Sequence, residues 1–209
     1  MQILIFGDSI TYGAWDEKGG WASRLRAFTD KKHNFGQTSP LVYNLGVDGD
    51  TTEGLLKRLD SEARPRMWPD SETIIIFDIG SNDSLFVHST KRNMVSKEKL
   101  EENTRKLIGL ARKITPKVVF LGMIPIDEAR TVPLSWDKNL SYKMEYIKAY
   151  KECIKSVCRK RRTGFIDLFE EWMRLDYKKM LKDGIHPDSR GHELIFNSVK
   201  EFLLENKWI

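Results

Sequence analysis

Ser9 lies in the polar segment FGDSITYG, residues 6–13, directly after an apolar run at the start of the chain. A serine hydroxyl becomes an effective nucleophile only when a base removes its proton, and neutral histidine is the usual base near pH 7. His186 is the best candidate base, because Asp183 precedes it by three residues and is placed to accept a hydrogen bond from the imidazole. These residue types predict a serine nucleophile with a histidine base and an orienting carboxylate.

Attack by a serine on a carbonyl carbon creates an oxyanion, which requires hydrogen-bond donors. Three groups are candidate donors: the backbone N–H of Ser9, the backbone N–H of Gly49 and the side-chain amide of Asn82. We expect the missing side chain of Gly49 to let its amide approach a substrate closely. The three donors come from three separate segments of the chain.

Each candidate residue also has a purely structural interpretation. Ser9 fits the N-cap of a helix that follows a strand, and GSND (80–83) is typical of a turn. His186 precedes a proline and fits a loop before a helix, while Asp8 is interpreted as a structural hydrogen-bonding residue. His192 falls inside a predicted helix, and we assign it no metal-binding role. The joint placement of the candidates, more than any one of them, favours catalysis.

The elements that must position these residues alternate along the chain. Near-continuous apolar runs rich in β-branched residues predict buried parallel strands, and segments of helical periodicity separate them. The predicted strands are residues 2–7, 41–46, 73–80, 117–125 and 164–168. The intervening helices carry inward positions such as Trp21, Leu55, Leu107 and Ile154, and the last helix is predicted over residues 189–205.

This alternation predicts an α/β sheet with right-handed crossovers and helices on both faces. Ligands bind such a sheet beyond the carboxyl ends of its strands, which is where the candidate residues follow their strands. Asp50 and Glu53 are spaced as a cap pair for the second helix. Two irregular stretches, residues 86–96 and 126–139, are candidates for loops that shape a pocket.

The composition of the chain bears on the number of domains and on nucleic-acid binding. A length of 209 residues with 40% hydrophobic content suits one domain over residues 1–209, and the net charge of +5 is a small excess on a heavily charged surface. The densest basic cluster, CRKRR (158–162), falls at the end of a predicted helix, where positive charge is favourable. We therefore expect no nucleic-acid partner.

The cysteines and the hydropathy pattern bear on the compartment. Cys153 and Cys158 lie five residues apart on one predicted helix, which suits neither a disulfide nor a metal pair. No run approaches the ~20 apolar residues of a membrane span, and residues 1–7 lack the features of a secretion signal. We expect a cytoplasmic protein with reduced thiols and no integral membrane association.

Four segments together resemble the four sequence blocks of the SGNH hydrolases, also called the GDSL family of esterases and lipases. The matching segments, which cover nearly the whole chain in order, are GDSI with Ser9, NLGVDGDTT with Gly49, GSND with Asn82, and DGIHP with Asp183 and His186. Ile10 stands where the family name has leucine, and Asp188 stands where we expect asparagine. Neither departure falls on a residue with a chemical role. No G-x-S-x-G is present, which argues against the α/β-hydrolase class.

The resemblance implies a flavodoxin-like three-layer α/β/α sandwich around a central five-stranded parallel sheet. It implies a serine esterase, lipase or acylhydrolase that forms an acyl-enzyme and needs no cofactor or metal. In it Ser9 is the nucleophile, His186 the base and Asp183 its orienting acid. Ser9, Gly49 and Asn82 form the oxyanion hole.

The substrate is less closely defined than the reaction. Candidate pocket residues follow Asn82 or lie in the later irregular stretch: Leu85, Phe86, Ile126, Leu134 and Trp136. Short acyl esters, thioesters, lysophospholipids and acetylated sugars all fit this pattern. An acyltransferase using the same serine, and a non-catalytic flavodoxin-like module that binds an anion at a helix N-terminus, are the alternatives.

Overall fold

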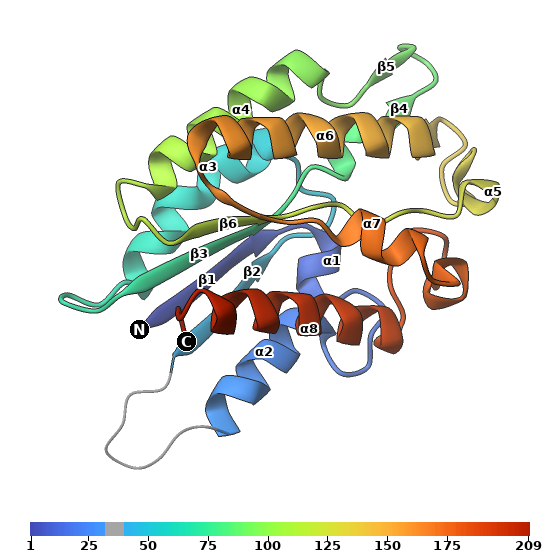
Figure 1. The fold of residues 1–209 in the computed structure, drawn as a ribbon. Coiled ribbons are helices and arrows are strands. Elements are labelled where there is room, and N and C mark those ends of the chain that lie inside the picture. Colours follow the sequence, from blue (N-terminus) through green and yellow to red (C-terminus); the bar gives the residue numbers. More distant parts are fainter. Residues whose placement is uncertain (32–39) are drawn as a thin grey trace.

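Five parallel strands form the central sheet of the computed structural model, which describes residues 1–31 and 40–209 (Figure 1). The strands follow the spatial order β2-β1-β3-β6-β8, so the first strand lies near the middle of the sheet. Their bounds are β1 Gln2–Gly7, β2 Leu41–Gly46, β3 Thr73–Asp78, β6 Val118–Leu121 and β8 Gly164–Ile166. All five predicted strands are confirmed, although the last three end before their apolar runs do.

Helices cover both faces of this sheet, which confirms the three-layer α/β/α architecture. Helices α3, α4 and α6 lie on one face, and α2 and α8 lie on the other (Figure 1). The helices are α1 Ser9–Tyr12, α2 Gly20–Lys31, α3 Thr52–Ala63, α4 Lys97–Ala111, α5 Glu128–Thr131, α6 Met144–Arg161, α7 Leu168–Met173 and α8 Ser189–Glu205. Short 3₁₀ turns occur at η1 Arg64–Arg66, η2 Asn82–Ser84 and η3 Tyr177–Met180.

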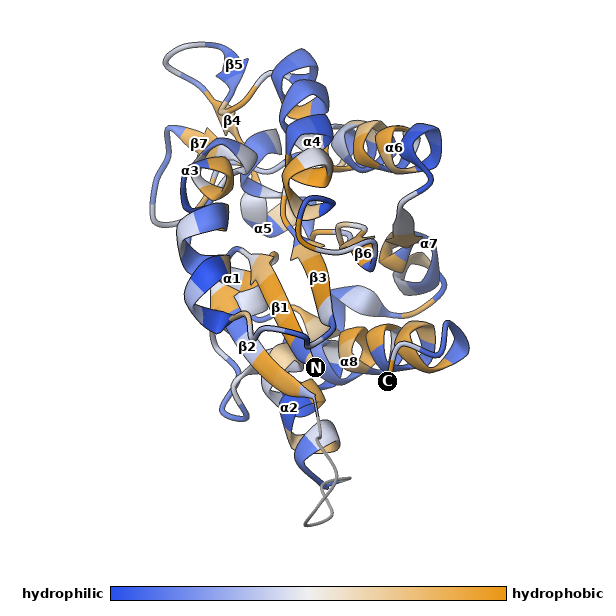
Figure 2. Ribbon diagram, turned by 90° about the vertical axis from the view of Figure 1, so that its left-hand side faces the viewer, coloured by the Kyte–Doolittle hydropathy of each residue, from blue (hydrophilic) through white to orange (hydrophobic). Residues whose placement is uncertain are grey.

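The core is divided into two layers by the alternation of side chains along the strands. In β1, Leu4 and Phe6 point into the layer under α3, α4 and α6, while Ile3 and Ile5 point toward α2 and α8. Every residue of β1 and β3 is buried, as parallel strands covered on both faces require. In Figure 2 the strands of the central sheet are mostly hydrophobic, whereas the helices around them carry both hydrophilic and hydrophobic residues.

The first stretch predicted as a loop, residues 86–96, contains two strands of a second, smaller sheet, and the third strand directly follows the other predicted stretch, residues 126–139. Strands β4 (Phe86–Val87), β5 (Arg92–Asn93) and β7 (Leu140–Ser141) pair antiparallel in the order β5-β4-β7. The strands are two residues long, which is too short for an alternating pattern to be visible in the sequence. This sheet joins the segment after β3 to the segment between β6 and α6.

Two local predictions about helix ends have different outcomes. The CRKRR cluster does close a helix: α6 ends at Arg161, and Arg162 has a left-handed backbone with φ of 52°. The predicted cap pair of Asp50 and Glu53 is wrong, because Thr51 caps α3 and accepts a hydrogen bond from the N–H of Gly54 at 3.3 Å. The Asp50 carboxylate instead accepts a hydrogen bond from Nε of Arg58.

The thiols of Cys153 and Cys158 are both free. Across the described residues, none of the helices has the length and apolar character needed to cross a bilayer.

His192 lies on the inner face of α8 and is fully buried in the layer beside α2. Burial disfavours its charged form and lowers the pKa of His192 from 6.5 to about 4. We predict that, as the pH falls from about 7.5 to about 5, the free energy of unfolding of the parent protein decreases relative to that of the variant His192→Gln. In this window the unfolded chain binds a proton that the folded chain does not, and the expected loss is about 2 kcal/mol.

Urea unfolding of both proteins at each pH measures this effect. The stability that the neutral imidazole of His192 contributes is fully present above about pH 6.5 and is lost as the pH falls toward 4. Burial raises the pKa of Asp78 and Asp83 to about 6, which changes stability in the opposite direction over part of this range. These carboxyls are common to both proteins and cancel in the difference. A difference independent of pH would contradict the prediction.

Candidate active site

The candidate residues meet at one edge of the central sheet because its strands are parallel. Ser9 follows β1, Gly49 follows β2 and Asn82 follows β3, while His186 and Asp183 lie in the loop before α8. The ends of β1 and β2 are packed tightly against α1. A Cβ on Gly46 would lie 2.3 Å from the backbone N of Tyr12, so only glycine permits this approach.

Ser9 is the first residue of α1, and Asp8 is the cap of that helix. The Oδ1 atom of Asp8 accepts a hydrogen bond from the N–H of Ile10 at 3.0 Å. Because Asp8 performs the capping, the Ser9 hydroxyl is not used for it. The Ser9 side chain points toward the loop before α8 and lies 2.9 Å from Nε2 of His186.

The imidazole of His186 connects Ser9 to Asp183. Its Nδ1 atom lies 2.6 Å from Oδ2 of Asp183, and Oδ1 of the same carboxylate accepts hydrogen bonds from the N–H groups of Ile185 and His186. Burial alone would raise the pKa of Asp183, but these hydrogen bonds and the nearby imidazole lower it to about 2. The ionised carboxylate therefore favours a proton on Nδ1 and leaves Nε2 free to accept one from Ser9.

The loop that carries His186 is attached to the segment after β6. Arg130 donates hydrogen bonds to the backbone carbonyls of Leu181 at 3.0 Å and Lys182 at 3.1 Å. The N–H of Asp127 donates to the carbonyl of Gly184 at 2.8 Å. The histidine loop thus depends on residues 127–130 for its position and has no strand of the central sheet within it.

The backbone amides of Ser9 and Gly49 have no hydrogen-bond acceptor within the described residues. Gly49 has a left-handed backbone with φ of 70°, and a Cβ there would meet no atom within 4 Å. The backbone conformation of Gly49 therefore favours glycine, and the close approach of its amide to a substrate stays a prediction.

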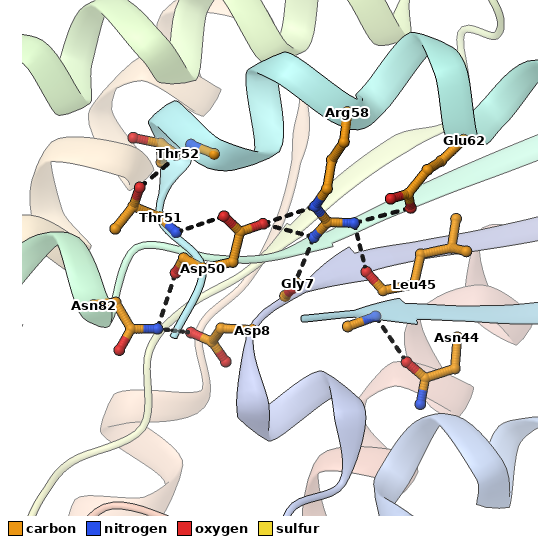
Figure 3. Close-up of polar contacts among 12 residues, drawn as sticks. Gly7, Asp8, Asn44, Leu45, Asp50, Thr51, Thr52, Arg58, Glu62 and Asn82 are labelled. Atoms are coloured by element: carbon orange, nitrogen blue, oxygen red, sulfur yellow. Dashed lines mark hydrogen bonds and ion pairs between the residues drawn. The ribbon is translucent and has the colours of Figure 1, made fainter. Parts of the chain in front are cut away.

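Asn82 has its side-chain amide held on both sides, as Figure 3 shows in part. Its Nδ2 donates to the backbone carbonyl of Asp50 at 2.9 Å and lies 3.4 Å from Oδ2 of Asp8. Its Oδ1 accepts a hydrogen bond from the hydroxyl of Tyr142. The next residue, Asp83, accepts hydrogen bonds from the N–H and hydroxyl of Thr52 and so ties GSND to the start of α3.

Arg58 on α3 joins the ends of two central strands and was not identified from the sequence. Its guanidinium donates to the carbonyls of Gly7 at 3.0 Å and Leu45 at 2.8 Å, and its Nε donates to Asp50 at 2.8 Å (Figure 3). Gly7 directly precedes the Asp8-Ser9 pair, and Leu45 precedes the turn that carries Gly49. No spacing in the sequence distinguishes Arg58 from the other charged residues of this helix.

Trp15 adjoins His186 from the loop after α1. Its Nε1 lies 3.2 Å from Nδ1 of His186, although that nitrogen already faces the ionised Asp183. One protonated Nδ1 cannot also accept a hydrogen bond, so the indole N–H has no suitable acceptor there. The side chain is 65% exposed, and its backbone is held in the left-handed region with φ of 64°.

A pocket of about 650 Å³ opens beside His186. Its lining consists of two exposed indoles and a polar set: Trp15, Trp136, Asp48, Ser135, Lys182, Asp183 and His186.

Of the five predicted pocket residues, only Trp136 lines this pocket. Leu85, Ile126 and Leu134 are buried in the core, and Phe86 stacks on Tyr146 at a centroid distance of 5.8 Å. These four therefore stay predictions to which the pocket adds no support.

Comparison with known proteins finds a family to which this chain is similar. The model of the GDSL-like lipase/acylhydrolase family matches residues 5–194. The GDSL esterase/lipase WDL1 of Oryza sativa subsp. japonica is 24% identical over 99% of this chain and 78% of its own length. An isoamyl acetate-hydrolyzing esterase 1 homolog of Bos taurus is 23% identical over 95% of this chain and 79% of its own length.

Solved structures share the fold over nearly the whole chain. A lipase/acylhydrolase from Enterococcus faecalis has a TM-score of 0.76 and 25% identity, covering 97% of this chain and 94% of its own. The acetyl xylan esterase AlAXEase has a TM-score of 0.73 and 19% identity, covering 97% of this chain and all of its own.

We predict that Arg58→Lys lowers the free energy of unfolding by about 3 kcal/mol, because lysine cannot reach both strand ends and Asp50 together. The Arg58 and Asp50 side chains are only 15% and 8% exposed, so water cannot replace the lost contacts. Urea unfolding measures the change. The matched control is Arg64→Lys. The ion pair between Arg64 and Asp60 is exposed, so changing it should have no measurable effect on the free energy of unfolding. Equal effects at both positions would contradict the prediction.

Proposed function

Because the chain belongs to the GDSL-like lipase/acylhydrolase family, we propose that it hydrolyses carboxylic esters with Ser9 as nucleophile. The observation that carries this proposal is the continuous series from Ser9 Oγ to His186 Nε2, at 2.9 Å, and from His186 Nδ1 to Asp183 Oδ2, at 2.6 Å. This is the order of contacts that a serine nucleophile, its base and the orienting acid require.

In the first half of the proposed reaction, Nε2 of His186 takes the hydroxyl proton as Ser9 Oγ attacks the ester carbonyl carbon. The resulting oxyanion accepts hydrogen bonds from the N–H groups of Ser9 and Gly49 and from the amide of Asn82. The N–H groups of Ser9 and Gly49 donate to no acceptor within the described residues, which supports this role because no existing hydrogen bond has to be broken. Return of the oxyanion electrons to the carbonyl expels the alcohol, which leaves with the proton from His186.

In the second half, His186 removes a proton from water as that water attacks the acyl-enzyme. Collapse of the tetrahedral intermediate then breaks the bond to Ser9 Oγ, which takes the proton back from His186 as the acid is released. Asp183 stays ionised throughout, because its pKa of about 2 lies far below neutral pH. Its charge stabilises the imidazolium that forms in each half, and its two backbone hydrogen bonds keep it aligned.

The structure favours this reaction over an anion-binding module. Helix α1 has only four residues, and the Asp8 carboxyl already accepts a hydrogen bond at its N-terminus. An incoming phosphate would have to displace that group. An acyltransferase or thioesterase would use the same residues as the hydrolase, and competition between water and an added alcohol distinguishes the transferase.

Within ester hydrolysis, a second candidate is the deacetylation of acetylated carbohydrates. The observation that favours it is the pair of exposed indoles, Trp15 and Trp136, in one pocket with Asp48, Ser135 and Lys182. An indole face packs against the C–H surface of a sugar ring, and the polar residues provide partners for its hydroxyls. The acetyl xylan esterase AlAXEase shares this fold.

We predict that an organophosphonate adds once to the protein and not to Ser9→Ala. The reagent reports a serine activated by a base, and Ser9 is the residue within hydrogen-bond distance of His186. Intact-mass spectrometry detects the adduct, and turnover of p-nitrophenyl esters from acetate to decanoate should fall by roughly 10⁴-fold or more in the variant. An unlabelled parent protein, or equal turnover in both, would reject Ser9 as nucleophile.

We predict that Trp15→Ala and Trp136→Ala each raise KM for acetylated xylooligosaccharides by roughly tenfold, and that Trp136→Ala leaves kcat for p-nitrophenyl acetate unchanged. Among the described residues, Trp136 lines the pocket without a hydrogen bond to Ser9, whereas Trp15 adjoins His186, so only Trp136 serves for the comparison of kcat. Trp68→Ala is the matched control, because Trp68 is 57% exposed and is not part of the pocket lining. If all three variants behave alike, the pocket does not bind the larger part of the substrate.

A further inference from the structure

We infer that Tyr142 is a positioning residue that orients the side-chain amide of Asn82 for the oxyanion. The inference rests on the proposed ester hydrolysis and adds a residue that the four family-like sequence segments do not include. The Tyr142 hydroxyl is within hydrogen-bond distance of Oδ1 of Asn82, and the tyrosine side chain is buried. Tyr142 itself touches neither Ser9 nor His186 among the contacts in the described chain.

The direction of this hydrogen bond follows from the chemistry of its partners. An amide oxygen only accepts, so the Tyr142 hydroxyl must donate to Oδ1 of Asn82. Burial, together with the carboxyl groups of Asp8, Asp48, Asp183 and Asp83, raises the pKa of Tyr142 above its usual value, so the phenol is protonated at neutral pH. It therefore carries the proton that it donates to Oδ1.

The amide of Asn82 is held in one orientation by partners on both sides. With Oδ1 held by Tyr142, Nδ2 faces the carbonyl of Asp50 and the carboxyl of Asp8, both of which accept hydrogen bonds (Figure 3). Rotating the amide by 180° would place two acceptors against each other at Asp50, and the Tyr142 hydroxyl would have to change from donor to acceptor. Without the Tyr142 hydroxyl, only the Asp50 side of this restraint remains firm.

One of the two Nδ2 hydrogens is held loosely and is the one available to an oxyanion. The contact with Asp50 is 2.9 Å long, whereas the contact with Asp8 is 3.4 Å long. Burial and the neighbouring Asp78 raise the pKa of Asp8 well above its usual value, which disfavours a charged acceptor at this position. Asp8 directly precedes Ser9 in the chain, and we assign the hydrogen that faces Asp8 to the oxyanion.

Tyr142 is itself held firmly in the segment between β6 and α6. Its N–H donates to the carbonyl of Thr131 at 3.1 Å, and the Thr131 hydroxyl donates back to the Tyr142 carbonyl at 2.9 Å. The adjacent strand β7 (Leu140–Ser141) pairs with β4. A rigidly placed donor of this kind lowers the reorganisation needed when charge develops on the substrate.

The test compares Tyr142→Phe with Tyr150→Phe. Tyr150 is the matched control, because its buried hydroxyl also makes one hydrogen bond, to the carbonyl of Val95 at 2.6 Å, and does not contact Asn82. We expect Tyr142→Phe to lower kcat for p-nitrophenyl butyrate by about tenfold with KM nearly unchanged. Tyr150→Phe should lose comparable stability with kcat unchanged. Titration of active sites with the phosphonate gives the concentration of active enzyme, so that unfolded protein does not lower the kcat that is calculated.

Asn82→Ala completes a double-mutant cycle. In that background Tyr142→Phe should have no further effect on kcat, because the amide that Tyr142 orients is gone. A tenfold loss in both backgrounds, or equal losses for Tyr142→Phe and Tyr150→Phe, would overturn the inference and leave Tyr142 with a structural role alone.

Ser9→Ala distinguishes the inference from the function on which it rests. If Ser9→Ala keeps its activity, the proposed function fails. If Ser9→Ala is inactive while Tyr142→Phe retains the parent kcat, only the role of Tyr142 fails.

Discussion

The guanidinium of Arg58 is the interaction on which the geometry of the site depends most. It binds the carbonyls at the ends of β1 and β2 and the Asp50 side chain, and it is only 15% exposed (Figure 3). The carbonyl of Gly7 also accepts a hydrogen bond from the N–H of Val47 at 3.0 Å, so Arg58 is a second donor that links this strand end to α3. One side chain on α3 therefore fixes both the segment that begins with Ser9 and the turn that carries Gly49. Through the carbonyl of Asp50, the same residue also restrains Asn82.

Carboxyl groups around Ser9 differ in pKa because their surroundings differ. Asp183 accepts three hydrogen bonds and stays ionised, while burial raises the pKa of Asp8 well above its usual value and that of Asp78 to about 6. A negative charge on Asp8 would oppose an oxyanion formed one residue away, and the raised pKa of Asp8 disfavours that charge. The arrangement places the permanent negative charge on the far side of the imidazole, where it stabilises positive charge.

The sequence was sufficient to predict the sheet, the helices on both faces and the last helix at its observed bounds, because these depend on strong apolar periodicity. It also predicted that Ser9 and His186 would meet, because parallel strands deliver their following residues to one edge. Tyr142, Arg58 and the role of Thr51 as a cap could not be predicted. Each depends on which of several polar side chains reaches a partner, and such choices are made by tertiary packing. The same holds for Leu85 and Leu134, whose apolar character fits a pocket and a core equally well.

The attachment of the histidine loop has a consequence for the energy landscape of the protein. Ser9 and Asn82 follow buried central strands, whereas residues 181–186 are held through Arg130 and Asp127 at the edge of the fold. Local opening of a segment requires only the free energy of its own contacts, and Arg130 makes them partly in water. The base can therefore separate from the nucleophile in a subglobal opening that withdraws Leu181 and Ile185 from the core layers and leaves the strands of the central sheet paired. Under mild denaturing conditions, the population of competent sites is set by this local equilibrium and falls before the sheet unfolds.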